Sequence, residues 1–338
     1  MDVLISSAAR GGLALLGKLG AVFLSPGSMF SAASLASALI IAIASLMWAR
    51  RGRGRRLKLR VLVRALFPRR LLHGASTRAD LGLFLFNTLA AGLLLGWTLL
   101  SAHAVSGPVA AGLQRWLGAH PAPAFPHAAR QLLATVALFL AYELAYWIDH
   151  YLSHRIPLLW DFHKVHHTAE TLSPLTAFRV HPVDSLVFAN ITAAIVGLAG
   201  GVLSYAFGPQ LSPYELAGSN IILIGFLFVT IHLQHSHLWI AFTGPLGRIL
   251  LSPAHHQVHH STNPAHFNRN FGSCLAVWDW AFGTLHAPSR TREPLAFGAE
   301  LSAGAAPPHS VTGTLVTPFI DAARRFTPAR GRMGAAAS

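Results

Sequence analysis

The sequence has very little cysteine and few charged residues. Cys274 is the only cysteine among 338 residues, which excludes both an intramolecular disulfide and a zinc site built on several thiolates. A metal held within this chain would need nitrogen or oxygen ligands, and 20 histidines can supply the nitrogen. Charged residues make up 11% of the chain and hydrophobic residues 53%. This composition is typical of a protein whose surroundings are largely lipid.

Long apolar runs are frequent, and their length indicates membrane spans. A helix needs about 20 mostly apolar residues to cross a bilayer. We therefore predict an all-α integral membrane protein with four to five transmembrane helices and a cytoplasmic helical cap that carries histidines. A shorter apolar stretch at 13–24, interrupted by Lys18, is expected to lie at the membrane interface and not to be a cleaved signal. The candidate spans are 29–48, 81–105, 131–149, 185–207 and 214–233.

Acidic residues are scarce, which leaves a formal net charge of +14. The densest basic segment, 49–60, directly follows an apolar run, and this placement is typical of a cytoplasmic loop and not of a nucleic-acid-binding module. The loop 50–80 is rich in arginine, whereas 106–130 contains only Arg115 and Arg130. Lys and Arg are retained on the cytoplasmic side. The segments predicted to be cytoplasmic are therefore 50–80, 150–184 and 234–338.

One histidine pattern, H-x-x-H-H, occurs twice, within FHKVHHTAE (162–170) and within AHHQVHHST (254–262). On a helix, positions i, i+3 and i+4 share a face, but adjacent side chains diverge by about 100° around the axis. Each trio therefore suits two metal ions better than one. The two predicted spans between the copies leave one membrane face and return to it, so the trios can form one site. They are His163, His166 and His167, and His256, His259 and His260.

Further histidines stand at helical spacing near the same predicted face. His150 and His154 are four residues apart, and the segment IHLQHSHLW contains His232, His235 and His237. Nitrogen ligands suit Zn, Cu, Fe or Ni, and this set exceeds the four ligands of a closed tetrahedral zinc site. We interpret the set as ligands of two ions with open coordination positions. Isolated histidines are expected to be ordinary polar residues; these include His73, His266 and His286.

The order of these histidine groups on a membrane scaffold resembles the fatty acid hydroxylase/sterol desaturase superfamily of integral membrane di-iron oxygenases. The resemblance runs from about 135 to 288 and includes LLWDFHKVHHTAE (158–170), FRVHPVD (178–184), LSPAHHQVHHS (251–261) and NFGSCLAVWDWAFGTL (270–285). It implies two non-haem iron ions, molecular oxygen and two external electrons, used to hydroxylate or desaturate a lipid. One departure is Tyr151, where the family often has arginine after the first histidine.

The resemblance also implies which histidines bind the metal. The third histidine box is ambiguous: His235 is favoured, with His232 or His237 as an additional ligand. No catalytic residue is implied beyond the metal site. The other expected ligands are His150, His154, His163, His166, His167, His256, His259 and His260.

Metal-bound imidazoles need outer acceptors that fix their tautomers and orientations. The polar residues expected to serve near the site, as acceptors or in related supporting roles, are Glu143, Asp149, His181, Asp184, Asn270 and Asp279.

The composition and the resemblance together suggest three regions, and the resemblance implies two kinds of partner. We expect an N-terminal membrane region (1–130), a hydroxylase-like catalytic region (131–288) and a flexible basic tail (289–338). The substrate would be a lipid, such as a sterol, hopanoid or fatty acyl chain. The electrons would come from a separate redox protein of ferredoxin or cytochrome type, because no haem-binding donor domain is recognisable in the chain.

Two other classes of protein also use histidines in membranes. A divalent-cation transporter would place ligands near the bilayer midplane on broken helices, and a bis-histidine haem cytochrome would place single histidines on facing helices. Neither accounts for the doubled H-x-x-H-H pattern.

Overall fold

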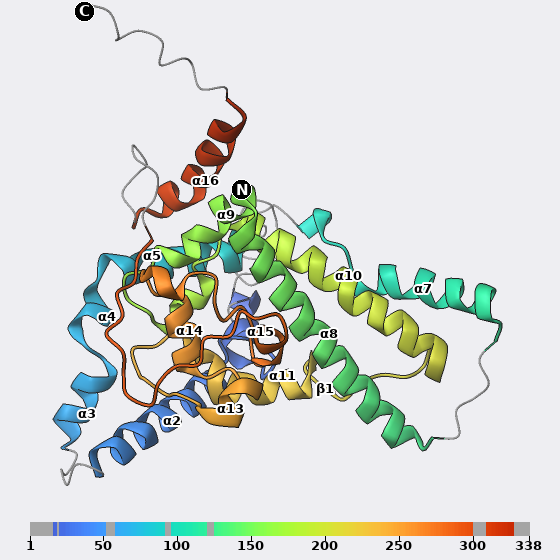
Figure 1. Ribbon diagram of the computed structural model, residues 1–338, viewed down its shortest axis with the longest axis horizontal. Coiled ribbons are helices and arrows are strands. Elements are labelled where there is room, and N and C mark those ends of the chain that lie inside the picture. The colour runs from blue at the N-terminus through green and yellow to red at the C-terminus, as the bar shows by residue number, and fades with distance from the viewer. Residues whose placement is uncertain are drawn as a thin grey trace, which may run out of the picture.

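The computed structural model describes residues 16–18, 20–51, 58–91, 96–119, 125–299 and 309–327. In this part of the chain nearly all regular structure is helical, as predicted (Figure 1). The exception is a short antiparallel hairpin of β1 (Glu215–Leu216) and β2 (Ser219–Asn220). The predicted interfacial helix at 13–24 begins outside the described residues.

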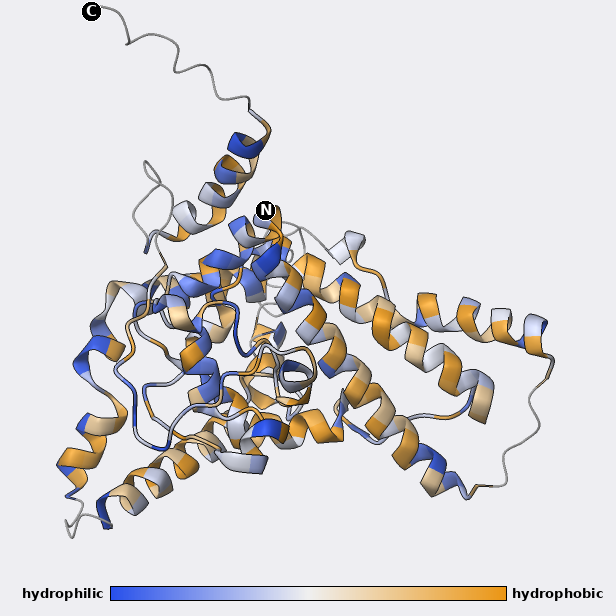
Figure 2. Ribbon diagram, in the orientation of Figure 1, coloured by the Kyte–Doolittle hydropathy of each residue, from blue (hydrophilic) through white to orange (hydrophobic). Residues whose placement is uncertain are grey.

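Three described helices are long and apolar enough to cross a membrane: α2 (Ala32–Arg51), α8 (His127–Arg155) and α10 (Pro182–Phe207). They match three of the predicted spans. In Figure 2 apolar residues run along most of α10 and much of α8, whereas hydrophilic residues gather around α9 (Pro157–His167) and α14 (Pro253–His259). The helices therefore have an apolar part, which suits a lipid environment, and a polar end around α9 and α14.

The other two predicted spans are not helices of spanning length among the described residues. The segment 214–233 begins with the β hairpin, and only the residues Ile221–Gln234 form a short apolar helix. It comprises α11 (Ile221–Phe226), a π-helical turn η4 (Leu227–Ile231) and α12 (His232–Gln234). Asn220 starts it, because its side chain accepts a hydrogen bond from the Ile222 amide at 3.0 Å.

The segment 81–105 is divided differently from the prediction. Helix α5 (Ala75–Phe86) continues into a π-helical turn η1 (Asn87–Ala91), and η2 (Gly96–Thr98) precedes α7 (Ala102–Leu117). Ser101 starts α7, because its hydroxyl accepts a hydrogen bond from the Ala104 amide. The apolar run thus belongs to two helices, of which the second extends well past its predicted end.

Helix α7 runs beside α10 in the same direction, at very short range (Figure 1). Gly197 and Gly201 stand one turn apart on α10. A methyl group built on Gly197 would lie 2.7 Å from the Ala102 carbonyl oxygen, and one built on Gly201 would lie 2.8 Å from that of Ser106. Small residues at this spacing allow two membrane helices to approach closely.

Helix α8 runs antiparallel to α10, since Arg130 near its start donates to the Phe207 carbonyl at the end of α10 at 3.3 Å. Its other end, near Arg155, leads directly into α9. Asn220 donates to the Thr135 carbonyl on α8, so the chain enters α11 beside the early part of α8. Helix α11 and its continuation then lead toward the same end as α9 and α14.

Within the segment expected to be a flexible tail, α16 (Val311–Phe326) is a helix that packs on α9. Ion pairs hold it in place: Lys164 contacts both Asp161 and Asp321, the latter at 2.6 Å, and Arg325 pairs with Asp161. Because Lys164 lies between two histidines of the first trio, α16 braces the helix that carries them.

A fully buried ion pair also supports this helix. Arg179 and Asp80 each have fully buried side chains, 2.8 Å apart. Arg179 also donates to the Val165 carbonyl and the Thr168 hydroxyl at the C-terminal end of α9. These two hydrogen bonds hold Val165 and Thr168, the residues on either side of His166 and His167. The remaining short helices are α3 (Leu59–Leu66), α4 (Arg69–His73), η3 (Pro174–Phe178), α13 (Gly244–Ile249), η5 (Pro264–His266) and α15 (Val277–Ala281).

Candidate metal centre

The fold brings nine predicted histidines together in two adjacent groups at the polar end of the helices. In each group one ring nitrogen per histidine lies within 4.8 Å of the others. We name these groups cluster A and cluster B. Cluster A is His150, His154, His163, His167 and His259, and cluster B is His166, His235, His256 and His260.

The two H-x-x-H-H trios are shared between the clusters. On α9, His163 and His167 join cluster A, while His166 points into cluster B. On and just after α14, the assignment is reversed: His256 and His260 join cluster B, while His259 reaches cluster A. The rings of His167 and His260 are 4.6 Å apart between centroids, so the clusters are neighbours. The divergence of adjacent histidines around a helix explains this division.

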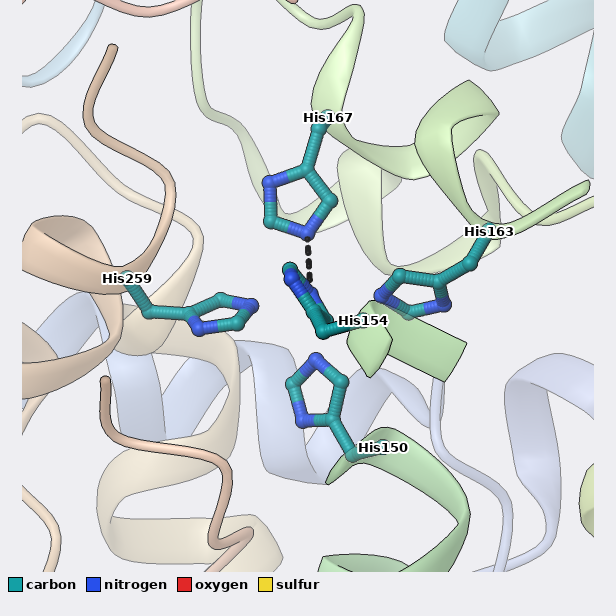
Figure 3. Close-up of side chains that lie close together, drawn as sticks. All are labelled: His150, His154, His163, His167 and His259. Atoms are coloured by element: carbon teal, nitrogen blue, oxygen red, sulfur yellow. Dashed lines mark hydrogen bonds between the residues drawn. The ribbon is translucent and has the colours of Figure 1, made fainter. Parts of the chain in front are cut away.

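Cluster A has rings from three helices that point toward a common centre (Figure 3). Three of its rings use Nδ1 to bond to outer acceptors: His150 to the Phe271 carbonyl at 2.8 Å, His163 to Asp184 at 3.1 Å, and His259 to the Arg269 carbonyl at 2.8 Å. In the same three rings Nε2 is buried with no hydrogen-bond partner. This is the arrangement of metal-binding histidines, with one nitrogen oriented by an acceptor and the other left for an ion.

In cluster B the Nε2 atoms converge. Nε2 of His235 lies 3.1 Å from that of His166, 2.9 Å from that of His256 and 3.3 Å from that of His260. Nδ1 of all four rings is buried without a partner. A neutral imidazole carries one N–H, so these nitrogens cannot satisfy one another. A cation at the centre would accept their lone pairs, and the residues present therefore fit a metal ion.

Burial keeps these rings neutral. It lowers the pKa of His235 to about 3 and that of His259 to about 3. It also lowers the pKa of His166, His256 and His260 well below the usual histidine value, and neighbouring histidines add to the effect. Metal ions bind neutral imidazole, so protons compete little for this site near neutral pH.

The structure separates the three histidines of the ambiguous third box. Helix α12 ends at Gln234, and the backbone of His235 turns out of the helix, which brings its ring into cluster B. His232 lies 2.9 Å from the Ser34 hydroxyl on α2, and His237 lies 2.6 Å from the Ala65 carbonyl. His232 and His237 therefore lie outside both clusters.

The residues expected to support the ligands have different neighbours. Asp184 contacts a ligand ring, that of His163. Asp279 accepts from the Phe271 and Gly272 amides, and so holds the loop whose carbonyl orients His150. Glu143 accepts from the Cys274 and Leu275 amides, and Asn270 donates to the His255 carbonyl. His181 caps α10, where its Nδ1 accepts from the Val183 amide.

Asp149 differs from these residues because it faces a cavity. Its Oδ1 atom is buried without a hydrogen-bond partner. The cavity, of about 390 Å³, is lined by Asp149, by His150 and His163 of cluster A, and by His166 and His235 of cluster B. Its remaining wall is mostly apolar and includes Tyr142, Phe178, Phe188, Leu223 and Leu227. One cavity therefore opens on both clusters.

Two hydrogen-bond acceptors that orient ligand rings could not be recognised in the sequence. The carbonyl groups of Phe271 and Arg269 contact His150 and His259. Every residue has such a carbonyl, so only the path of the chain reveals its role. The left-handed backbone of Asn268 and Asn270, each with φ 59°, shapes this path. Asparagine tolerates that conformation better than most residues.

Known proteins are similar to the part of the chain that contains both clusters. Residues 135–284 match the fatty acid hydroxylase family. Ornithine lipid hydroxylase OlsE of Rhizobium tropici is 31% identical over 148 residues, which are 44% of this chain and 40% of the relative. Human alkylglycerol monooxygenase is 27% identical over 149 residues, 44% of this chain and 30% of the relative. Human lathosterol oxidase is 26% identical over 197 residues, 56% of this chain and 58% of the relative.

The matched region contains both clusters and most of the residues that line the cavity. A helical protein with apolar helices of spanning length and two all-histidine groups belongs to the class of histidine-rich membrane proteins. The match over residues 135–284 and these relatives fit the fatty acid hydroxylase/sterol desaturase superfamily. The chain spans less than two thirds of each of these relatives. No solved structure matches it.

Proposed function

We propose that this protein is a membrane-bound oxygenase that hydroxylates or desaturates a lipid with two non-haem iron ions, O2 and external electrons. The observation that carries the proposal is the single, mostly apolar cavity onto which both histidine clusters open. A lipid chain in this cavity would lie beside both clusters. Enzymes related to this chain include a lipid hydroxylase and a monooxygenase by name.

Each cluster would hold one iron through Nε2 atoms. When bound, the pair of irons would supply the O2 activation and electron transfer that amino-acid side chains cannot provide. The chain's own residues fix the geometry: Asp184 and the Phe271 and Arg269 carbonyls orient three rings of cluster A. Because these acceptors set which nitrogen carries the proton, Nε2 of each ring is left as the ligand.

The cavity wall would position the lipid and exclude water. Two buried oxygens on it, Oδ1 of Asp149 and Oδ1 of Asn87, have no hydrogen-bond partner. The amide nitrogen of Asn87 is already committed to the Phe178 and Val180 carbonyls. Both atoms can accept a hydrogen bond, so the cavity suits a lipid that carries a hydroxyl or an amide N–H. A lipid with a free carboxylate would face the acidic side chains of Asp149 and Asp184. The lining residues include no lysine or arginine that would neutralise its charge.

Iron content and lipid composition test the proposal together. Purified protein should contain close to two irons per chain and no haem, and cells that express it should accumulate a lipid with one added oxygen or one added double bond. Unchanged lipids in expressing cells, with iron-loaded protein present in the membrane, would exclude the enzyme. Tightly bound zinc and no iron after anaerobic iron loading would exclude the two-iron centre.

We also propose a multi-pass arrangement with the metal centre on the cytoplasmic face, where a separate redox protein would deliver electrons. The arginine-rich loop 50–80 supports this orientation. Leu117, the last residue of α7, is 68% exposed. It lies at the end of the helices that is opposite to the two clusters. A cysteine at Leu117 should therefore react with an impermeant thiol reagent from outside the cell, and one at Thr291 should not.

The natural Cys274 is fully buried, so the background of this experiment is low. A Cys274→Ala chain provides the control. Labelling of Thr291→Cys in intact cells, without labelling of Leu117→Cys, would reverse the orientation.

A further inference from the structure

A third group of potential ligands lies outside clusters A and B. It consists of His266 in η5, His286 after α15 and Glu293, and one ligand atom from each residue lies within 4.8 Å of the other two. The three residues belong to two loops that are separated by about twenty residues of chain. Two imidazoles and one carboxylate form a donor set that zinc commonly takes in proteins.

The distances leave room for an ion between the three side chains. Nε2 of His266 is 3.9 Å from Oε2 of Glu293, too far for a hydrogen bond. The rings of His266 and His286 are 4.9 Å apart between centroids and steeply inclined to each other. Two ligands on one zinc ion at about 2.0–2.2 Å are separated by about 3.3 Å. Small rotations of these side chains would therefore complete the coordination.

The burial of the His266 ring supports a ligand at this place. The side chain of His266 is 8% exposed, and its Nδ1 is buried with no hydrogen-bond partner. With Nε2 beyond hydrogen-bond range of Glu293, this buried imidazole lacks the partners that buried polar groups normally have. His286 and Glu293 are partly exposed, so an ion and a water molecule can reach the group from solvent.

We propose that His266, His286 and Glu293 form a third metal site, for a single divalent cation of the zinc type, that fastens these two loops together. Water would fill the fourth position. The partly exposed position of the group suits a structural ion.

The position of the site suggests what it stabilises. Between the two loops runs the segment that holds Arg269, whose carbonyl orients His259 of cluster A. The next residue, Asn270, accepts from the His286 amide at 2.7 Å and donates to the His286 carbonyl at 2.9 Å. A cation on His266 and His286 would fix both ends of this segment and so keep the acceptor of His259 in place.

Zinc binding to the full-length protein tests the proposal independently of the iron centre, because the quantity measured is a difference between variants. After chelator treatment and equilibration with zinc, His266→Ala and Glu293→Gln should each bind one ion fewer than the wild type. His127→Ala, with an exposed histidine at the start of α8, should bind as many as the wild type. Zinc should also raise the thermal midpoint of the wild type more than that of Glu293→Gln.

Equal zinc content in the wild type and both variants would overturn the proposal. Glu293→Gln keeps the shape of a partly exposed side chain, so it remains informative if His266→Ala does not fold. In crystals of the wild-type protein grown with zinc, anomalous scattering at the zinc edge should show a peak between the three side chains. Its absence would also overturn the proposal.

Discussion

Replacing His235 by alanine should remove most of the activity and lower the iron content of the purified protein. The ring of His235 contacts three other cluster B rings through Nε2, at 2.9 to 3.3 Å. Loss of this central donor leaves three ligands that were arranged around it. Changes to residues that only orient a ligand reduce metal affinity or activity by about 10–100-fold, so loss of the ligand should exceed that range.

His237→Ala is the matched control, two residues further along the same loop. Its ring contacts the Ala65 carbonyl and lies outside the clusters. Metal content and product formation should stay close to the wild-type values. If the His235→Ala protein kept the iron content of the wild type and formed the same lipid product at the same rate, cluster B would not be a metal site.

Replacing Arg179 by alanine should lower the free energy of unfolding by about 3–5 kcal/mol, because it leaves a buried carboxylate without its counter-ion. Asp80 lies in a fully buried environment, and burial raises the pKa of its carboxyl even beside Arg179. The same change removes two hydrogen bonds from the end of α9. Metal should therefore be lost at a lower temperature than in the wild type, as thermal unfolding monitored with iron release would show.

Arg324→Ala provides the comparison. Its side chain is 57% exposed and its contact with Asp321 is 3.6 Å long, and exposed pairs contribute about 0–1 kcal/mol. A double change of Arg179 and Asp80 to apolar residues should recover part of the lost stability, since no unpaired charge remains. Equal midpoints for Arg179→Ala and Arg324→Ala would show that the buried pair does not brace α9.

The histidines of the site could be predicted because their spacing is local. Helix geometry alone places His166 and His167 about 100° apart, and the structure accordingly puts them in different clusters. The third box could not be resolved in this way, because His235 reaches cluster B only where α12 ends. His232, at the start of that helix, instead contacts Ser34 in a segment far away in the sequence, and histidine spacing alone does not reveal such a contact.

Other features were missed for related reasons. Apolar composition marks membrane segments but not where a helix is interrupted, so the run at 81–105 was expected to be one span and is divided by the Ser101 cap. The composition of the last fifty residues suggested a flexible tail, yet α16 forms a helix whose ion pairs with α9 join residues far apart in the chain. His266 and His286 looked isolated in the sequence for the same reason.

The glycines of α10 have a consequence for how a lipid reaches the metal centre. The backbone contacts of Gly197 and Gly201 with α7 are so close that an acyl chain cannot pass between α7 and α10. The lining of the cavity includes Gly27 and Ser219, where a turn of the N-terminal segment meets the β hairpin. Loops separate more readily than close-packed helices, so a lipid would enter the cavity more readily at this junction than between α7 and α10.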